Sequence, residues 1–386
     1  MEDNNVGYIY YSLIICSLIT AMAASFIFFG IIPAALVCVS GIAALVLWYF
    51  CRTQSERIND RILPWYLLTT IALLLKNIEE LLFGYPAAFV HAVPSLIPDV
   101  AIFDNQHYFA VYSCLLTAIF MLGAVGIVRK NRLGDYLTYF VFVWAILDGA
   151  LHFLLPLFFG TFSYFPGQLF ALISLVIAAG GLRTLLSGHS APKPPAVPVW
   201  RAPRRKFIPV VLIFIACFAT AMYDQAGLRP TLIVCGSMLG GMVIWIKTTF
   251  KKPLYSRELM LAYLWTLAIF FFHITEEYLT NFPGRIDGIF NTQWTLDQFA
   301  VLIVFVGPVF WILGAVLYYY HHPLGDYLVW FIFFGMIVGE PTHYLVFPLL
   351  EGGRFHYFPA MWTALFPMIP AIYGAALLIK GYRKQR

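Results

Sequence analysis

Residues 259–280 read LMLAYLWTLAIFFFHITEEYLT, an apolar run that ends in a histidine and two glutamates. A transmembrane helix needs about 20 predominantly apolar residues, and this run supplies them. Ionisable groups are costly inside a bilayer, so His273, Glu276 and Glu277 are candidates for a functional site. The stretch predicts a membrane-spanning helix that carries a polar site near its end.

The composition of the whole chain agrees with a membrane protein. Of its 386 residues, 61% are hydrophobic and 11% are charged, and the mean hydropathy is +0.81. Soluble domains carry roughly one-quarter charged residues, so lipid is the expected solvent. A β-barrel would read as short alternating segments, which are not seen here. We expect an all-α, polytopic integral membrane helical bundle.

Apolar stretches of suitable length occur about twelve times along the chain. The acidic start, Glu2 and Asp3, predicts that the first stretch is a genuine helix and not a removable signal peptide. The six cysteines show no metal-type spacing and predict no disulfide framework. The expected spans are 8–29, 31–50, 62–82, 107–128, 135–158, 166–187, 207–226, 229–247, 259–280, 297–320, 326–350 and 359–380.

The basic residues between these spans are one-sided. If the N-terminus is cytoplasmic, only Arg229, Arg285 and Arg354 lie outside. Lys and Arg concentrate in cytoplasmic loops, so the pattern predicts that both termini are cytoplasmic, and the net charge of +5 needs no nucleic-acid partner. The residues on the inside are Arg52, Arg57, Arg61, Arg129, Lys130, Arg132, Arg183, Lys193, Arg201, Arg204, Arg205, Lys206, Lys247, Lys251, Lys252, Arg257 and the tail 380–386.

The chain contains the same landmarks twice, which predicts an internal duplication of a six-span unit. An even number of spans per copy makes the two copies parallel, a 6+6 tandem repeat about an axis along the membrane normal. With a separation of 191, LGDYL at 133–137 recurs at 324–328, LGAV at 122–125 recurs at 313–316, and His152 recurs as His343. With slightly different offsets, Glu79-Glu80 matches Glu276-Glu277, and Tyr164-Phe165-Pro166 matches Tyr357-Phe358-Pro359.

A proline-rich and basic stretch, SGHSAPKPPAVPVWRAPRRK at 187–206, separates the two copies. Its prolines disfavour helix, and its basic end suits a cytoplasmic membrane surface. We expect an N-terminal repeat over 1–187, a cytoplasmic linker over 188–206, and a C-terminal repeat with the histidine motif over 207–386.

Ionisable groups gather in two spans of the second copy. His273 lies one helical turn from Glu276 and Glu277, and two spans later Glu340 and His343 stand at i and i+3. These spans run in the same direction, so all five groups can lie at one depth, in the outer part of the membrane. His273, Glu276, Glu277 and His343 resemble a ligand set for zinc or non-haem iron. Without a metal, the same groups and Glu340 can act as general acid and base.

The first copy carries a related set: Lys76, Glu79, Glu80, Asp148 and His152. Lysine stands here in place of the motif histidine and can neutralise a glutamate at i+3 or i+4, so this set is interpreted as a second, partly decayed site. A Schiff base on Lys76 is a less favoured alternative. For both copies the alternative is a purely structural role, in which a fixed polar network sets the register of the helices.

Other polar and aromatic residues receive structural interpretations. Asp135 and Asp326 follow a glycine at the start of a span, which predicts helix caps. His321 and His322 are expected in a solvated loop. Aromatic residues such as Trp294 are interpreted as interfacial belts and bundle packing, and few helices broken by glycine or proline are expected.

These motifs resemble the uncharacterised HXXEE-motif membrane family, whose members have an early HxxEE and a later histidine followed by Tyr-x-Pro-Gly. The second copy matches the first element and has Ala360 in place of the final glycine, whereas the first copy has Tyr164 to Gly167 intact and Lys76 in place of histidine. The resemblance covers roughly 60–170 and 257–367. It implies a membrane location and two tandem copies of the domain, and it assigns no activity.

Three functions agree with these features. The first is a membrane-embedded enzyme, metal-assisted or acid–base, that acts on a small apolar or lipid-like substrate entering from the bilayer, because His and Glu residues concentrate at one depth. The second is a proton-coupled secondary transporter, which the 6+6 repeat and the carboxylates favour. The third is a scaffold or receptor-like protein with a structural polar core.

Overall fold

The protein is represented by a computed structural model that describes residues 31–52, 60–84, 106–158, 164–187 and 204–385, with Ile58 and isolated positions between residues 15 and 25. Most of the predicted span 8–29 and of the predicted linker 188–206 lies outside the described residues. Contacts divide the chain into two compact units. One is formed by Met1–Tyr112 and Gly123–Pro192, the other by Ser113–Leu122 and Lys193–Arg386.

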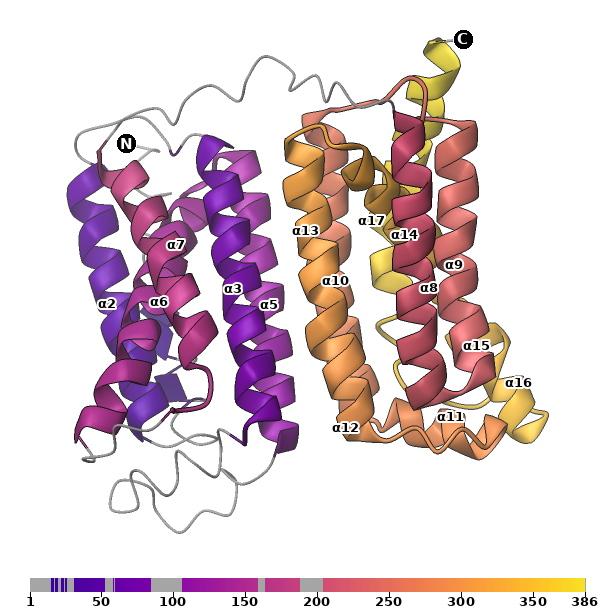
Figure 1. Ribbon diagram of the computed structural model, residues 1–386, viewed down its shortest axis with the longest axis horizontal. Coiled ribbons are helices and arrows are strands. Elements are labelled where there is room, and N and C mark those ends of the chain that lie inside the picture. The colour runs from indigo at the N-terminus through magenta and orange to yellow at the C-terminus, as the bar shows by residue number, and fades with distance from the viewer. Residues whose placement is uncertain are drawn as a thin grey trace. The chain divides into compact units, whose positions relative to one another are not determined.

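Where the structure describes the chain, it consists of helices and contains no strand (Figure 1). Eleven of its helical segments are long and apolar enough to cross a membrane. This confirms the predicted polytopic helical bundle. Large apolar side chains remain exposed on several helices, among them Val176, Ile213 and Leu232 at 60%, 63% and 62%. Such side chains are stable in contact with lipid, which is the solvent that the composition predicts.

In the first unit, α6 lies at the centre and packs against α2, α3 and α7, while α3 also packs against α7. This arrangement brings the end of α3, which carries Lys76 to Glu80, next to α6, which carries Asp148 and His152. The helices are α2 (Ile31–Arg52), α3 (Leu63–Leu82), α6 (Arg132–Phe158) and α7 (Gln168–Leu186), and a 3₁₀ turn, η1 (Asp60–Ile62), precedes α3. The ends of α5 (Gln106–Arg129) also belong to this unit, whereas its residues Ser113–Leu122 are assigned to the other.

In the second unit, α14 is central and packs against α9, α13 and α17, while α10 packs against α13 and α17. The helices are α8 (Phe207–Ala226), α9 (Leu228–Lys247), α10 (Arg257–Leu279), α11 (Phe282–Phe290), α12 (Leu296–Phe299), α13 (Gly307–Tyr319), α14 (Pro323–Gly339), α15 (Thr342–Leu345), α16 (Phe347–Gly352) and α17 (Leu365–Lys384). A 3₁₀ turn, η2 (Arg204–Lys206), precedes α8, and a π-helical segment, η3 (Ala300–Val306), joins α12 to α13.

The repeated LGDYL element marks a close crossing of two helices in each unit. A Cβ atom built on Gly134 would lie 2.2 Å from the backbone carbon of Gly126, and one on Gly325 would lie 2.3 Å from the backbone nitrogen of Tyr318. No side chain fits at such distances, so only glycine allows α6 to approach α5 and α14 to approach α13 this closely. The recurrence of this glycine in the sequence therefore has a packing cause.

One predicted span of the second unit is not a continuous helix. The predicted span 326–350 is interrupted after Gly339 by a turn at Glu340 and Pro341, and it continues as the short helices α15 and α16. Pro341 lacks a backbone N–H and its ring disfavours a continuous helix, which explains the break. A second irregularity, the π-helical segment η3, lies directly before α13.

Asp135 and Asp326 lie in the first turns of α6 and α14, where a negative charge suits the helix dipole, but the prediction that their side chains cap these helices is wrong. Asn131 accepts from the backbone N–H of Gly134 at the start of α6. At the start of α14 the cap is His322, whose side chain accepts from Leu324 N–H and which is buried instead of solvated. Asp326 pairs with Arg204 and accepts from the hydroxyl of Tyr255. Its carboxylate therefore ties the segment before α8 to α14.

Candidate functional site

Two elements of the second unit supply the polar cluster of the motif. α10 carries His273 and Glu277 on one face of its last turns, since residues four apart lie above one another. The break after α14 carries Glu340 and His343. Because the chain turns at Glu340 and Pro341, the backbone N–H of His343 bonds to the carbonyl of Glu340 (3.1 Å), which keeps both side chains on one side of the break.

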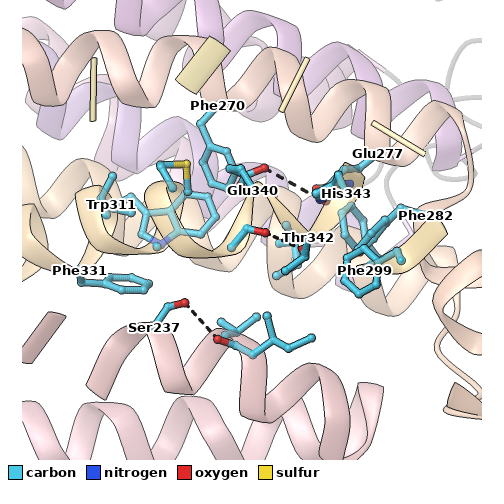
Figure 2. Close-up of a pocket in the computed structure, with 18 of the residues that line it drawn as sticks. Ser237, Phe270, Glu277, Phe282, Phe299, Trp311, Phe331, Glu340, Thr342 and His343 are labelled. Carbon is cyan, nitrogen blue, oxygen red and sulfur yellow. Dashed lines mark hydrogen bonds and ion pairs between the residues drawn. The ribbon is translucent and has the colours of Figure 1, made fainter. Parts of the chain in front are cut away.

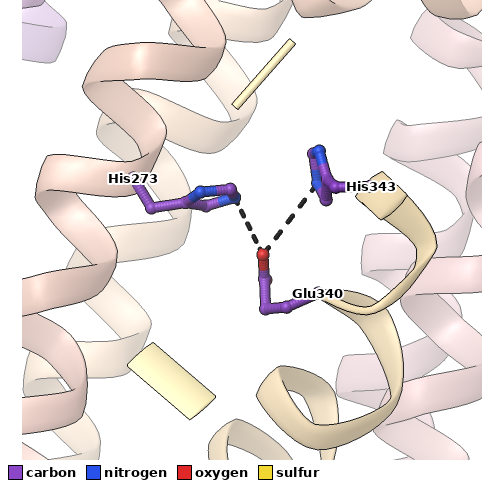
Figure 3. A group of neighbouring side chains, drawn as sticks. All are labelled: His273, Glu340 and His343. Carbon is purple, nitrogen blue, oxygen red and sulfur yellow. Dashed lines mark ion pairs between the residues drawn. The ribbon is translucent and has the colours of Figure 1, made fainter. Parts of the chain in front are cut away.

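The four side chains meet in the interior of the unit. The Nε2 atom of His273 lies 2.8 Å from Oε2 of Glu340 and 3.6 Å from Oε1 of Glu277. The Nε2 atom of His343 lies 3.4 Å from the same Glu277 oxygen and 3.9 Å from the same Glu340 oxygen. Figure 3 shows Glu340 between the two imidazoles. The side chains of His273 and Glu277 are 0% and 8% exposed, so water screens these charges little.

Hydrogen bonds at the far nitrogens fix the tautomer of both histidines. The Nδ1 atom of His343 lies 2.8 Å from the carbonyl oxygen of Pro359, which can only accept, so Nδ1 carries the proton. The Nδ1 atom of His273 lies 3.0 Å from the hydroxyl of Thr363. That hydroxyl donates to Glu276 (2.6 Å), so it accepts from His273. Both Nε2 atoms therefore point a lone pair at the carboxylates when the rings are neutral.

This arrangement brings together only electron-pair donors. Glu277 and Glu340 accept and do not donate when ionised, and the neutral imidazoles offer lone pairs to them. Nε2 of His273 and Oε2 of Glu340 are close, yet they lack the alignment of a hydrogen bond, and both are buried without a hydrogen-bond partner. Among the described residues, neither carboxylate has a lysine or arginine within ion-pair distance. The negative charge of the two buried carboxylates is therefore balanced only when a cation or additional protons bind to the cluster.

Three of these residues form a group that can hold a metal ion. Ligand atoms of His273, Glu340 and His343 all lie within 4.8 Å of one another, and all three residues are buried. Glu277 lies beside this group, in contact with both histidines, but is not a member of it. The sequence predicted His273 and His343 in a metal set; it placed Glu340 only in the acid–base set.

Glu276 points away from this group and holds the start of the last span. Its carboxylate accepts from the hydroxyl of Tyr357 (2.9 Å), from Thr363 N–H (3.0 Å) and from the Thr363 hydroxyl. A carboxylate at the unpaired N–H groups before α17 is stabilised there by the helix dipole. The prediction of Glu276 as a metal ligand is not matched by this geometry, because Glu276 reaches the cluster only through Thr363.

Glu79, the counterpart of Glu276 in the first unit, makes the same kind of contacts. It accepts from the hydroxyl of Tyr164 and from the backbone N–H groups of Leu169 (3.1 Å) and Phe170 (2.9 Å) at the start of α7. The first glutamate of each pair is thus bound to the tyrosine of the Tyr-Phe-Pro segment. The role of this glutamate in both units is to anchor the last helix.

The backbone after the Tyr-Phe-Pro segment is left-handed in both units. Gly167 has φ 93° and Ala360 has φ 61°. Glycine adopts this conformation without steric cost, whereas alanine does so at a cost of roughly 1–2 kcal/mol. A Cβ atom on Gly167 would lie 2.7 Å from Glu80 and 3.0 Å from His152. Ala360 therefore adds local strain to the second unit, whereas in the first unit only glycine fits at this position.

The first unit completes its cluster with a cation from its own chain. Nζ of Lys76 lies 2.9 Å from Glu80 and 3.0 Å from Asp148. His152 places Nδ1 2.8 Å from the carbonyl of Asp148 and Nε2 2.8 Å from Glu80. The carbonyl can only accept, so Nδ1 carries a proton, and one further proton is shared between Nε2 and Glu80. The ammonium of Lys76 is the built-in cation of this buried group.

A small cavity of about 140 Å³ adjoins the cluster of the second unit (Figure 2). Glu277, Glu340 and His343 lie on its wall, and Thr342 and Ser237 add hydroxyls. Most of the remaining lining is apolar, with Phe270, Phe282, Trp294, Phe299, Trp311 and Phe331 among it. An apolar cavity therefore opens directly onto the charged groups.

Sequence reasoning missed three contributors to this site. Thr363 and Pro359 fix the histidine tautomers from the segment before α17, and Trp294 lines the cavity instead of serving only as a belt residue. The Tyr-Phe-Pro match gave a signal for Pro359, since that segment recurs beside the site. Nothing in the spacing of Thr363 or Trp294 indicates their contacts.

No protein-family model, curated protein or solved structure matches this chain. The function must therefore be argued from the site.

Proposed function

We propose that the protein is a membrane-embedded enzyme that uses a divalent metal ion, zinc or iron, held by His273, Glu340 and His343, on a small apolar or lipid-like substrate. The observation that carries the proposal is the convergence of two imidazole lone pairs and two carboxylates in a buried place without a cation from the chain. We also propose membership of the HXXEE-motif family, with two tandem copies and cytoplasmic termini.

The chemistry of the donor set fits a divalent metal. Two carboxylates carry two negative charges, which a divalent ion neutralises. Two histidines and a carboxylate form the ligand set of catalytic zinc sites and of non-haem iron sites that keep positions open for substrate. Ligand atoms around a tetrahedral zinc with bonds of about 2.1 Å lie roughly 3.4 Å apart. The two nitrogen–oxygen distances within the proposed ligand set, 2.8 Å from Glu340 to His273 and 3.9 Å from Glu340 to His343, lie on either side of that value.

The hydrogen bonds behind the histidines fit a metal site as well. Metal-bound histidines commonly donate their other N–H to a carbonyl or carboxylate, which fixes the ring and makes it a better ligand. Pro359 does this for His343 directly, and Glu276 does it for His273 through the Thr363 hydroxyl. These contacts give the second Tyr-Phe-Pro segment a chemical role.

Each residue then has a defined task. A divalent metal in this place supplies Lewis-acid activation of water or of a carbonyl oxygen. Glu277 stands outside the group of mutually close ligand atoms yet lines the cavity, so we assign it the transfer of a proton to or from the substrate. The apolar lining excludes water and receives the substrate.

The experiment is metal analysis of the purified full-length chain, with His273→Ala and Glu340→Gln beside His356→Ala as a matched control. His356 is a histidine on the loop after α16 and outside the cluster. The proposal expects stoichiometric zinc or iron in the wild type and in His356→Ala, and its loss in the other two variants. A wild-type protein that stays metal-free after loading with either ion overturns it.

A proton-coupled transporter is the second candidate, and one observation favours it. Transporter sites often lie at interrupted helices, and Glu340 stands at the break between α14 and α15. In that case the two carboxylates carry protons. Proton-coupled uptake into vesicles that disappears with Glu277→Gln, in a protein that contains no metal, would decide for transport.

A further inference from the structure

Trp294, one of the residues that line the cavity beside the cluster, carries a hydrogen-bond donor without a partner among the described residues. Trp294 lines the cavity and is 5% exposed. Its Nε1 atom is buried and has no hydrogen-bond partner within the described part of the chain. A buried donor without a partner costs about 1–3 kcal/mol. A bound ligand that supplies the missing acceptor would remove this cost.

The surrounding structure fixes the indole in this place. Phe282 and Phe299 contact its ring at centroid distances of 6.3 and 5.4 Å. The following residue, Thr295, caps α12 in a reciprocal hydrogen-bond pair with Gln298. The preceding residue, Gln293, has φ 59° and donates its N–H to Asp287 (2.5 Å). A left-handed residue on one side and a capped helix on the other therefore fix the backbone at Trp294 by more than side-chain packing.

The indole and the charged cluster belong to one cavity. Phe282, which contacts the indole, also stacks on the imidazole of His343 with a centroid distance of 5.0 Å. Figure 2 shows Phe282 beside His343 and Glu277, while Trp311 and Phe331 lie at the other end of the lining. A molecule in the cavity thus meets both the polar groups of the cluster and the aromatic rings of the lining.

The two glycines of α14 that line the cavity leave it open. A Cβ atom on Gly339 would have no atom within 4 Å, and one on Gly335 would have its nearest neighbours at 3.9 Å. A larger residue at Gly339 would therefore fill space that belongs to the cavity without displacing the helix. Gly236 on α9 is equally open but does not line the cavity.

We propose that this cavity binds a small, uncharged and mainly apolar molecule that carries a carbonyl oxygen, and that Trp294 Nε1–H donates to that oxygen. The size agrees, because an apolar cavity of about 150 Å³ holds a molecule the size of benzene. The carboxylates on the wall disfavour an anionic ligand. The inference rests on the proposed function in one respect, since it names the substrate class of the same site.

The test uses two isosteric probes, cyclohexanone and methylenecyclohexane, which differ only in the acceptor oxygen. Binding to the full chain in lipid nanodiscs is measured by calorimetry, and the carbonyl stretch of bound cyclohexanone by infrared spectroscopy. We expect wild type to prefer cyclohexanone and to lower its carbonyl frequency. Trp294→Phe keeps an aromatic side chain but removes the N–H, so it loses the frequency shift and weakens cyclohexanone binding roughly three- to tenfold. Gly339→Leu abolishes binding of both probes, whereas Gly236→Leu leaves both unchanged.

The proposal is overturned if neither probe binds the wild type, or if Trp294→Phe binds cyclohexanone with the wild-type affinity and frequency. The same titrations on His273→Ala separate this result from the metal question. Probe binding in a chain that holds no metal supports the pocket and refutes only the metal. Metal without probe binding refutes only the pocket.

Discussion

Nζ of Lys76 lies 3.0 Å from the Oδ2 atom of Asp148, which stands on another helix of the first unit. The second unit has a histidine where the first has this lysine, and its carboxylates lack an ammonium partner among the described residues. The first unit thus carries a lysine cation among its buried carboxylates, whereas the described part of the second unit places two histidines there and no lysine or arginine.

His273→Lys should transfer the built-in cation to the second unit. We expect its metal content to fall to background while its unfolding temperature stays near that of the wild type, because the new ammonium can pair with Glu277 and Glu340. His273→Ala should also lose the metal but be less stable, since an unpaired buried charge costs about 3–5 kcal/mol. Metal analysis and thermal unfolding in detergent check both variants. Wild-type metal content in His273→Lys would contradict the proposed site.

Lys76→Met should destabilise the first unit by about 3 kcal/mol, because it leaves Glu80 and Asp148 buried with less positive charge. Lys130→Met is the matched control. Lys130 pairs with Asp60 at 3.9 Å, and the two side chains are 50% and 37% exposed. Such a surface pair contributes about 1 kcal/mol or less. If denaturant unfolding shows the same loss of unfolding free energy for the two variants, the buried pair stabilises the protein no more than the surface pair does.

Thr363→Val should weaken metal binding while the fold is kept. The change removes the hydroxyl that joins Glu276 to Nδ1 of His273 and preserves the shape of the side chain. Loss of such a supporting contact typically lowers metal affinity by about 10- to 100-fold. Competition with a chelator measures the affinity, and Thr363→Ser should restore it. An unchanged metal affinity in Thr363→Val would show that Thr363 does not support the metal site.

A pH-dependent contact joins α11 to α16 at the edge of the same unit. Glu351 binds Arg285 through two 2.5 Å contacts and His356 through a third. The hydrogen bond to Glu351 raises the pKa of His356 above its ordinary value. A group with a raised pKa stabilises the fold below its unfolded pKa, about 6.5 for histidine, and this contribution is lost as pH rises through the folded pKa.

We therefore expect proteolysis near residues 352–356 to accelerate as the pH rises from 6 toward 8 (about the range in which histidine titrates) in the wild type. His356→Gln should show little change over the same range. A wild-type rate that does not vary with pH, once the pH response of the protease is subtracted, would refute this role of His356.

Hydropathy predicted most of the spans, because the need to satisfy every backbone group in lipid imposes long apolar helices. It did not predict the break after Gly339, although Pro341 and Pro348 are visible in the sequence. Prolines are tolerated in many transmembrane helices, so their presence alone does not separate a kink from a break. The prediction of a cap at Asp326 was wrong because its carboxylate pairs with Arg204, which is 122 residues away in the sequence. Local sequence does not reveal such a partner.

The sequence by itself determined the helical membrane fold and the location of the motif. Both depend on hydropathy and on the 3.6-residue period of a helix, which involve residues close together in the sequence. It also indicated that only the second copy has the complete motif. Only the tertiary structure decided which groups meet. It separates Glu276, which anchors α17, from Glu277, which faces the histidines, and it adds Glu340, Thr363 and Pro359 from segments far along the chain. Adjacent residues on a helix point about 100° apart, so a spacing cannot assign them to one site until the neighbouring helices are in place.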